Sequence, residues 1–245
     1  MMTILTEIIE SLQAGDSPVK TVCTGAFWTA VVSKYGGLSS TYRDMDPQHD
    51  DNPKFVEDAG NLHEKSALEL ARYALSDHTV AASIGMAAIN SLIDVDESKC
   101  SNLNAAEIVM GKGAGKNVAV VGHFPFIPKL RESAKRVWVI EKKPRPGDRP
   151  AEEAAEILPQ CDVVCLTSSA FINHTIEDLL PLCENSFVVL TGPTSPLTPI
   201  LFDHGVDVIC GARITNPERV VQYITQGACF RQMKFAGVKL LSLAK

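Results

Sequence analysis

The chain has 245 residues, of which 45% are hydrophobic, and a formal net charge of −6. A chain of this length buries a sizeable core without cross-links, and its acidic balance argues against nucleic-acid binding, which needs a basic face. No apolar run reaches the roughly 18 residues of a membrane span, and the opening residues lack the basic segment and long apolar core of a signal peptide. The seven cysteines form no C-x-x-C pair, so we expect reduced thiols in a cytoplasmic protein.

The first part of the chain predicts a small α+β unit. Apolar residues at helical spacing between Ile4 and Leu12 predict a helix that stops at Gly15. The next segment, 19–43, is rich in Val, Thr and aromatic residues. It predicts two or three antiparallel strands, with Gly36 and Gly37 placed for a tight turn.

Helices are expected to follow these strands. Asn61 and Glu64 have the spacing of a helix start, which predicts a helix that runs to about Leu75. Residues 77–93 are apolar on nearly every side, as in a helix that is buried all round. Residues 93–102 are interpreted as a linker, and Asn104 with Glu107 predicts the cap of one more short helix.

From Lys116 onward the pattern changes to a strand, a loop and, in most cases, a helix-like stretch. Five short apolar runs predict buried parallel strands, and they lie at 117–122, 136–141, 161–167, 186–192 and 206–211. Five such units predict a doubly wound parallel sheet. The predicted fold class is therefore α/β, with a small α+β domain at 1–100 and a Rossmann-like domain at 101–245.

Polar or glycine residues follow most of these predicted strands. In an open parallel sheet, ligands bind beyond the carboxyl ends of the strands, which here carry Gly122 to Phe124, Glu141, Thr167 and Gly192 to Ser195. A small-molecule site at this edge is one interpretation. The other is that Ser, Thr and Gly simply cap the following helices.

The first loop does not have the glycines of a dinucleotide-binding site. Phe124 and Ile127 stand where the second and third glycines belong, which argues against a nicotinamide cofactor. Glu141 lies 19 residues after Gly122, close to the spacing of an acid that holds a ribose hydroxyl, although it could equally be a solvated surface residue. His123 is a candidate ligand, an acid/base group or a hydrogen-bonded turn residue.

Of three further polar features, two have two interpretations each and one is explained by a helix cap. The Gly192–Ser195 loop precedes a helix-like stretch, so it is either an anion site at a helix start or an ordinary proline-rich turn. Asn173 and Thr175 precede another such stretch, and one of them is expected to be its cap. Asn90 lies in the apolar helix and needs hydrogen-bond partners, which are either backbone groups or a cleft.

An acidic loop follows the predicted antiparallel strands. Its members are Asp44, Asp46, His49, Asp50 and Asp51. Their spacing is not that of an EF-hand, so a solvated loop or a lid is favoured over a hard-cation site.

Taken together, the motifs resemble one family. They are "GAFWTAV", "AAIN", "VVGHFPF", the strand ending in Glu141, "TSSAFINHT" and "TGPTSPLTPILFDHGVDVICG". The family carries the label "putative heavy-metal chelation", and the resemblance covers nearly the whole chain. It implies an enolase-N-terminal-like domain with a three-stranded meander and helices, then a Rossmann-like domain, with a site in the cleft between them. The enolase likeness concerns the fold alone, so enolase activity is not implied.

The resemblance also implies the residues of that cleft. Carried over by matching motif, they are Gly122, His123, Phe124, Glu141, Thr167, Asn173, Thr175, Gly192, Pro193, Thr194 and Ser195, with Asn90 facing them from the first domain. The chain departs from the label in one respect, because no His/Cys cluster is visible. A direct transition-metal site prefers such ligands, whereas a metal held by an organic chelator does not require them.

The leading hypothesis is a cytoplasmic protein that binds a small anionic metabolite or a metal chelate in the interdomain cleft, with turnover left open. His123 and Glu141 would be its acid/base or ligating groups, and the resident metal, if there is one, is a transition metal. The alternative is an enzyme with a nucleotide-like cofactor such as S-adenosylmethionine, whose ribose Glu141 would hold. A third hypothesis is metal storage or delivery without turnover. A homodimer fits this architecture, and no membrane or nucleic-acid partner is expected.

Overall fold

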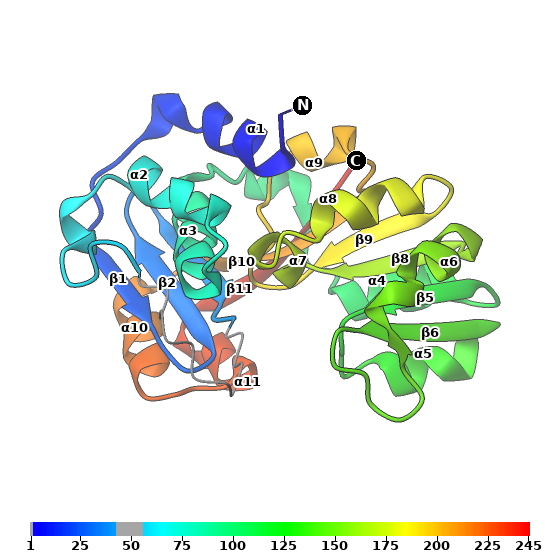
Figure 1. Cartoon of the computed structure of the whole chain (residues 1–245). Helices are drawn as coiled ribbons and strands as arrows, with labels where there is room; N and C mark the ends of the chain where they lie inside the picture. Colours follow the sequence, from blue (N-terminus) through cyan, green and yellow to red (C-terminus); the bar gives the residue numbers. More distant parts are fainter. Residues whose placement is uncertain (1, 43–55) are drawn as a thin grey trace.

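The computed structural model describes residues 2–42 and 56–245. Within these residues one sheet of 11 strands runs through the molecule, in the order β1-β2-β3-β10-β9-β8-β5-β6-β7 (Figure 1). Strand β11 pairs with β10 outside this order, and β4 pairs with β11. Helices cover both faces of this sheet, which confirms the predicted α/β class. In the described ranges no helix is long and apolar enough to cross a membrane.

The elements before residue 93 are an antiparallel meander and the helices that pack on it. They are α1 (Ile4–Ser11), β1 (Thr21–Thr24), β2 (Trp28–Val32), β3 (Gly36–Ser40), α2 (Ala67–Ala71) and α3 (Thr79–Leu92). Helix α3 is buried on nearly every side, as predicted, because it lies between α2 and strands β2 and β3. The three-stranded meander and the first helix are confirmed as well.

Gly36 and Gly37 do not form the turn that was predicted for them. The turn is at 33–35, where the Ser33 N–H donates to the Tyr35 carbonyl, and both glycines belong to β3. A Cβ on Gly37 would lie 2.0 Å from the carbonyl oxygen of Ala87 in α3. Glycine is therefore needed here for close packing of helix on strand, not for turn geometry.

The helix predicted from Asn61 begins later in the chain. Asn61 makes no side-chain cap, and residues 62–64 form a single 3₁₀ turn. The capping box is made by Ser66 and Glu69, directly before α2. A 3₁₀ extension then carries the helical segment to Leu75, so its predicted end is confirmed.

The second half contains the five predicted parallel strands. They are β5 (Asn117–Val121), β6 (Arg136–Glu141), β8 (Val163–Thr167), β9 (Phe187–Thr191) and β10 (Val208–Ile214). Before them, Asn104 and Glu107 form the predicted capping box of α4 (Ala105–Gly113). A short strand that was not predicted, β7 (Arg149–Pro150), extends the sheet beyond β6.

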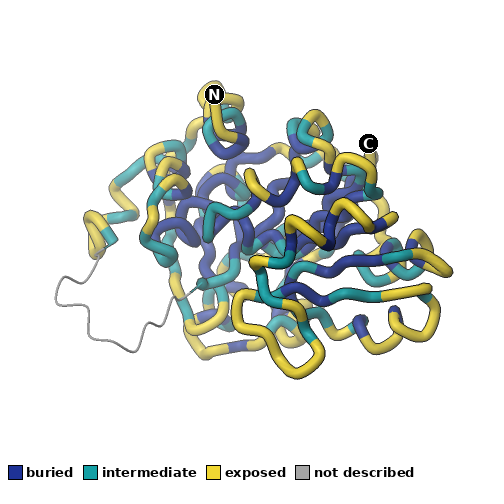
Figure 2. Tube along the Cα trace, turned by 45° about the vertical axis from the view of Figure 1, so that its right-hand side comes forward, coloured by how far each residue is buried: buried dark blue, intermediate teal, exposed yellow. Residues whose placement is uncertain are grey.

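Side chains along the parallel strands alternate between two cores. Val118 and Val120 belong to the core under α4 and α5 (Ile127–Ser133), whereas Ala119 belongs to the opposite core. That opposite face carries α6 (Ala154–Ile157), α7 (Ser169–Ile172), α8 (Ile176–Leu179) and α9 (Ile200–Asp203). Residues of the inner strands β5, β8 and β9 are mostly buried (Figure 2), and the sheet is covered on both faces as predicted.

Strand β10 joins the two parts of the sheet. It pairs with β9 over Val208–Cys210 and meets Gly36 of β3 at Ile214. Its other edge pairs along its whole length with β11 (Val238–Ala244), an antiparallel strand that the sequence did not predict. Strand β11 in turn pairs with β4 (Cys100–Ser101), so the expected linker at 93–102 is part of the sheet.

The last helices of the chain cover the first strands. Helix α10 (Pro217–Thr225) packs against β1 and β2, and Phe230 of α11 (Phe230–Met233) contacts Trp28 of β2 (Figure 1). The Trp28 indole N–H also donates to the Ala228 carbonyl at 3.0 Å. The division into domains 1–100 and 101–245 stays a prediction, since strands and helices from the two ranges share one sheet and one core.

Candidate functional site

The order of the parallel strands reverses between β5 and β8. The chain forms β5 first, adds β6 on one side, and then returns to place β8, β9 and β10 on the other. In open α/β sheets ligands bind at such a switch point, beyond the carboxyl ends of the strands. His123 directly follows β5 at this position, and Thr167 is the last residue of β8.

One cavity of about 510 Å³ opens at this switch point, and we call it the acidic pocket. Six predicted site residues line it, namely Gly122, His123, Glu141, Thr167, Asn173 and Thr175. Tyr42, Glu152 and Asp178 also line it and were not predicted. Among the described residues, the lining therefore includes three carboxylates, those of Glu141, Glu152 and Asp178, and one lysine, Lys142.

His123 is held by a carboxylate that the sequence analysis missed. Its Nε2 lies 2.6 Å from Oδ2 of Asp148, whose side chain is only 4% exposed. Burial alone would raise the pKa of Asp148, but the hydrogen bonds from His123 and from the Arg145 N–H outweigh it and leave the pKa below its usual value. Asp148 is thus ionised at neutral pH and accepts a hydrogen bond from the Nε2–H of His123, so Nδ1 is the ring nitrogen left for a ligand.

Side-chain hydrogen bonds order the other wall of the acidic pocket. The Thr175 hydroxyl donates to Oδ1 of Asn173 at 2.7 Å, between α7 and α8. Thr175 is the N-terminal boundary residue of α8, but its side chain makes no cap bond, and Asn173 ends α7. Thr175 is therefore the cap residue of α8 by position, as expected for one of the two. Oδ1 of Asn173 also accepts from the Thr175 N–H at 3.3 Å, and both residues line the pocket as well.

A second cavity of about 630 Å³ adjoins the first, and we call it the aromatic chamber. The predicted residues Phe124, Gly192 and Pro193 line it, and His123, Thr167 and Ser169 line both cavities. Its other lining residues include Trp28, Phe126, Phe230, Lys234 and Cys210. Trp28 and Phe230 come together through the contact of α11 with β2, which no local sequence pattern reveals.

The Gly192–Ser195 loop does not start a helix. Helix α9 begins only at Ile200 and has four residues, so the predicted anion site at a helix start is wrong. The Gly192 N–H donates to Cys210, and the Ser195 N–H donates to Gly192. Gly192 has φ +138°, and a Cβ there would lie 2.3 Å from Oγ of Ser168, so contact with the neighbouring strand end explains the glycine.

Thr194 and Asn90 tie this loop to the antiparallel strands. The Thr194 hydroxyl is fully buried and accepts from the Ser40 N–H at 3.0 Å. The Asn90 amide donates to the carbonyls of Leu38 at 2.9 Å and Thr194 at 3.2 Å, so Asn90 pairs with backbone. These two predicted site residues therefore connect the loop to β3 and α3 through hydrogen bonds.

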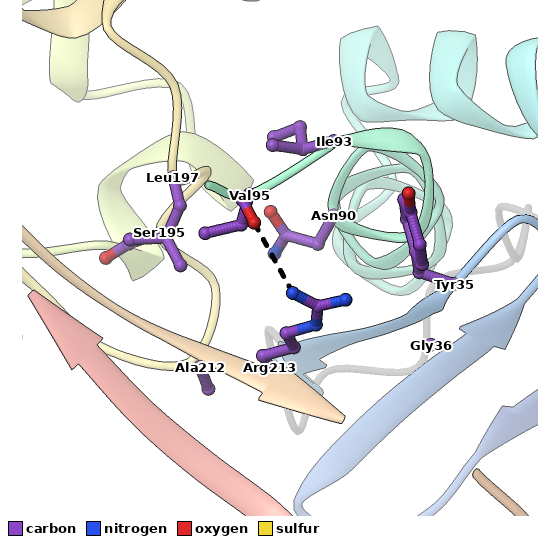
Figure 3. A pocket seen from close by; sticks show the side chains of 9 residues that line it. All are labelled: Tyr35, Gly36, Asn90, Ile93, Val95, Ser195, Leu197, Ala212 and Arg213. Carbon is purple, nitrogen blue, oxygen red and sulfur yellow. Dashed lines mark hydrogen bonds between the residues drawn. The ribbon is translucent and has the colours of Figure 1, made fainter. Parts of the chain in front are cut away.

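Asn90 and Ser195 line a third, water-sized cavity of about 10 Å³ beside Arg213 (Figure 3). Arg213 donates to the Val95 carbonyl and to Glu97 there. The Ser195 hydroxyl is buried without a hydrogen-bond partner among the residues described. A space of this size holds at most about one water molecule. Neither Asn90 nor Ser195 is among the residues that line the two large cavities.

No group of three or more His, Cys, Asp or Glu residues within 2–42 and 56–245 is placed to hold a metal ion. Burial raises the pKa of the Cys210 thiol in the aromatic chamber to about 11, which keeps it protonated and a poor metal ligand. The acidic loop with Asp44, Asp46, His49, Asp50 and Asp51 lies outside the described residues.

The fold and these adjoining cavities define an α/β protein whose candidate site lies at the switch point of a doubly wound sheet. A family model, DUF364, described as "Putative heavy-metal chelation", matches residues 104–241, and a second model with the same description, DUF4213, matches residues 6–93. The chain therefore belongs to the DUF364 family.

Two crystal structures from this family are similar over their full length. A protein of unknown function from Desulfitobacterium hafniense has a TM-score of 0.84 and 26% identity, covering 98% of this chain and 99% of that chain. A protein of unknown function from Pyrococcus horikoshii has a TM-score of 0.82 and 21% identity, covering 99% and 100%. A comparison with curated proteins finds no match.

Proposed function

We propose that the protein binds a metal–chelate complex at the switch point, with the metal directed toward His123 and Glu141. The observation that carries this proposal is the acidic pocket, which brings an oriented imidazole and several carboxylates to one cavity without assembling a metal site of protein ligands alone. A chelator that supplies most of the ligands leaves one or two coordination positions open. A single imidazole nitrogen and a carboxylate are suited to fill them.

The charges around the pocket favour a metal complex over a simple anion. Glu141, Glu152 and Asp178 all line the acidic pocket, so a bare carboxylate or phosphate placed among them would be repelled. A bound divalent cation reverses this local balance. An anionic group of the ligand is better placed in the aromatic chamber, which Lys234 lines.

The fixed geometry of His123 is suited to metal ligation. Histidine ligands in metal sites usually donate their second ring N–H to a carboxylate or carbonyl, which fixes the tautomer and raises ligand basicity. Asp148 provides this partner to Nε2. His123 and Glu141 are also the candidate acid/base groups if the ligand undergoes reaction in the pocket.

A nucleotide-like cofactor such as S-adenosylmethionine remains a second candidate, because Glu141 ends β6 and lines the same pocket as Gly122. This candidate predicts that adenosine-type ligands bind and that Glu141→Ala abolishes their binding. A cytoplasmic location and a homodimer stay predictions.

The test is calorimetric titration with the 1:1 complex of Zn²⁺ and iminodiacetate, a three-donor chelator that leaves metal positions open. The wild type should bind the complex, and His123→Ala and Glu141→Gln should each weaken binding about tenfold or more, which corresponds to at least about 1.4 kcal/mol. Glu132→Gln, on the exposed side of α5, is the matched control. Stoichiometric binding of Zn²⁺ alone, equally tight in all variants, would overturn the proposal in favour of direct storage.

A further inference from the structure

Two pairs of aromatic rings line the aromatic chamber, and they come from distant parts of the chain. Phe124 and Phe126, after β5, stack with ring centroids 5.4 Å apart and planes at 18°. Trp28 of β2 and Phe230 of α11 lie 5.3 Å apart at 47°. All four residues are only partly buried, so ring surface remains available to the cavity that they line.

The charge of the chamber differs from that of the acidic pocket beside it. No acidic side chain of the described residues lines the chamber, and Lys234 supplies its positive charge. The floor is polar but uncharged, with Thr191, Ser168 and Gly192 at the strand ends. A volume of about 630 Å³ lies within the range of small-molecule sites, which combine aromatic walls with few polar groups.

The two cavities share part of their lining at the ends of β5 and β8. His123, Thr167 and Ser169 line both. A ligand that extends across this shared rim would place one end among aromatic rings and a lysine, and the other end beside Glu141. Aromatic rings attract other planar rings in offset-stacked or edge-to-face arrangements, and lysine attracts carboxylates.

We infer that the chelator is a planar aromatic acid, whose ring lies in the aromatic chamber, whose anionic group meets Lys234, and whose donor atoms hold the metal toward His123. This inference deepens the proposed function and rests on it. It assigns Trp28, Phe124, Phe230 and Lys234 as residues that determine ligand specificity.

The test compares two chelators with the same donor set. Pyridine-2,6-dicarboxylate and iminodiacetate each offer one nitrogen and two carboxylates, but only the first has an aromatic ring. In calorimetric titrations of the full chain with the 1:1 Zn²⁺ complexes, we expect the pyridine complex to bind about tenfold tighter. This factor corresponds to about 1.4 kcal/mol, which is within the range of aromatic stacking.

Three substitutions test whether the residues of the aromatic chamber cause the preference for the aromatic chelator. Phe124→Leu and Phe230→Leu keep an apolar side chain without a ring, and each should remove most of the tenfold preference, so that the two complexes bind with nearly equal affinity. Lys234→Gln should weaken the Zn²⁺ complex of pyridine-2,4,6-tricarboxylate several-fold, with a reduced dependence on salt, because the carboxylate at position 4 of that ring is not a metal ligand and is free to meet the lysine. The matched controls are Phe235→Leu, whose ring is 72% exposed and does not line the chamber, and Lys129→Gln on the exposed surface of α5.

The outcomes distinguish failure of the aromatic ligand from failure of metal–chelate binding as a whole. Equal affinity of the wild type for both complexes, unaffected by the ring substitutions, would overturn the aromatic ligand and leave metal–chelate binding intact. Failure of both complexes to bind would overturn the proposed function and the inference together. A preference that Phe235→Leu removes as fully as Phe124→Leu would show that the chamber is not its source.

Discussion

Asp148 accepts a hydrogen bond from Nε2 of His123 at 2.6 Å, across a separation of 25 residues in the sequence. The same carboxylate oxygen accepts from the Arg145 N–H at 2.8 Å, so the loop after β6 is folded around the acid. His123 lies at the rim that the acidic pocket and the aromatic chamber share. One buried acid therefore fixes the orientation of the side chain that both cavities have in common.

Asp148→Asn should lower the free energy of unfolding by about 1–2 kcal/mol at pH 7, because it removes a charge-assisted hydrogen bond to His123. The folded-state pKa of Asp148 lies below its usual value of 3.8. Its contribution to stability is therefore complete above about pH 4 and is lost as the pH falls through the folded pKa. Urea unfolding at pH 7 and near pH 3 measures both effects.

The wild type and Asp148→Asn should accordingly differ at pH 7 and converge at the lower pH. Asp203→Asn, at an exposed position on α9, is the control and should change stability by less than about 0.5 kcal/mol. A difference between the wild type and Asp148→Asn that grew as the pH fell would contradict the assignment of Asp148 as an ionised partner of His123.

Gly37→Ala should destabilise the protein by about 3 kcal/mol, because the added Cβ would meet the backbone of α3 at the Ala87 carbonyl. Gly111→Ala is a matched control in helix α4, where nothing lies within 4 Å of the added Cβ. Alanine is the better helix former, so this control should raise stability slightly. Thermal and urea unfolding of the two variants give the comparison, and equal effects would refute the close packing of α3 on β3.

Asn90→Ala should cost about 1–3 kcal/mol of stability, because the buried carbonyls of Leu38 and Thr194 lose their donor. The affinity for the Zn²⁺–iminodiacetate complex should stay within about twofold in the folded fraction, since Asn90 lines neither large cavity. Asn102→Ala at an exposed position is the control for stability. A loss of ligand affinity with unchanged stability would indicate that Asn90 belongs to the binding site.

The thiols should fall into clearly different reactivity classes. Burial raises the pKa of Cys161 to about 11 and that of Cys183 to about 12, and it also raises the pKa of Cys165. Cys229 is exposed. A disulfide reagent at pH 7.5 should label Cys229 rapidly and reach the buried thiols only after unfolding. Cys229→Ser should remove the fast phase, and a fast phase that persisted would disprove this assignment.

The parallel strands could be predicted because they are buried on both faces and therefore appear as continuous apolar runs. Strand β11 was missed, although Val238–Ala244 is also apolar, since a short apolar run at a chain end suits a strand or a helix equally. The glycine errors have a different cause. Close contact with α3 requires glycine at position 37, and close contact with Ser168 requires it at position 192. Both contacts are with residues distant in the sequence.

Some residues of the candidate site could be predicted from the sequence and others could not, because only some of them lie at the ends of the parallel strands. Residues at the carboxyl ends of β5, β6 and β8, such as His123 and Glu141, meet at one edge because parallel strands place their ends together. Asp148, Trp28 and Phe230 reach that edge from a loop, an antiparallel strand and a late helix. Only tertiary packing brings them there, so spacing in the sequence carried no signal for them.

The packing of α10 and α11 on β1 and β2 has a consequence for synthesis of the chain. The antiparallel meander leaves the ribosome about 200 residues before the helices that cover its second face. During translation this face, which includes Ala30 and Leu38, has no partner from its own chain. The core between the meander and these helices is therefore completed only after most of the chain has been synthesised.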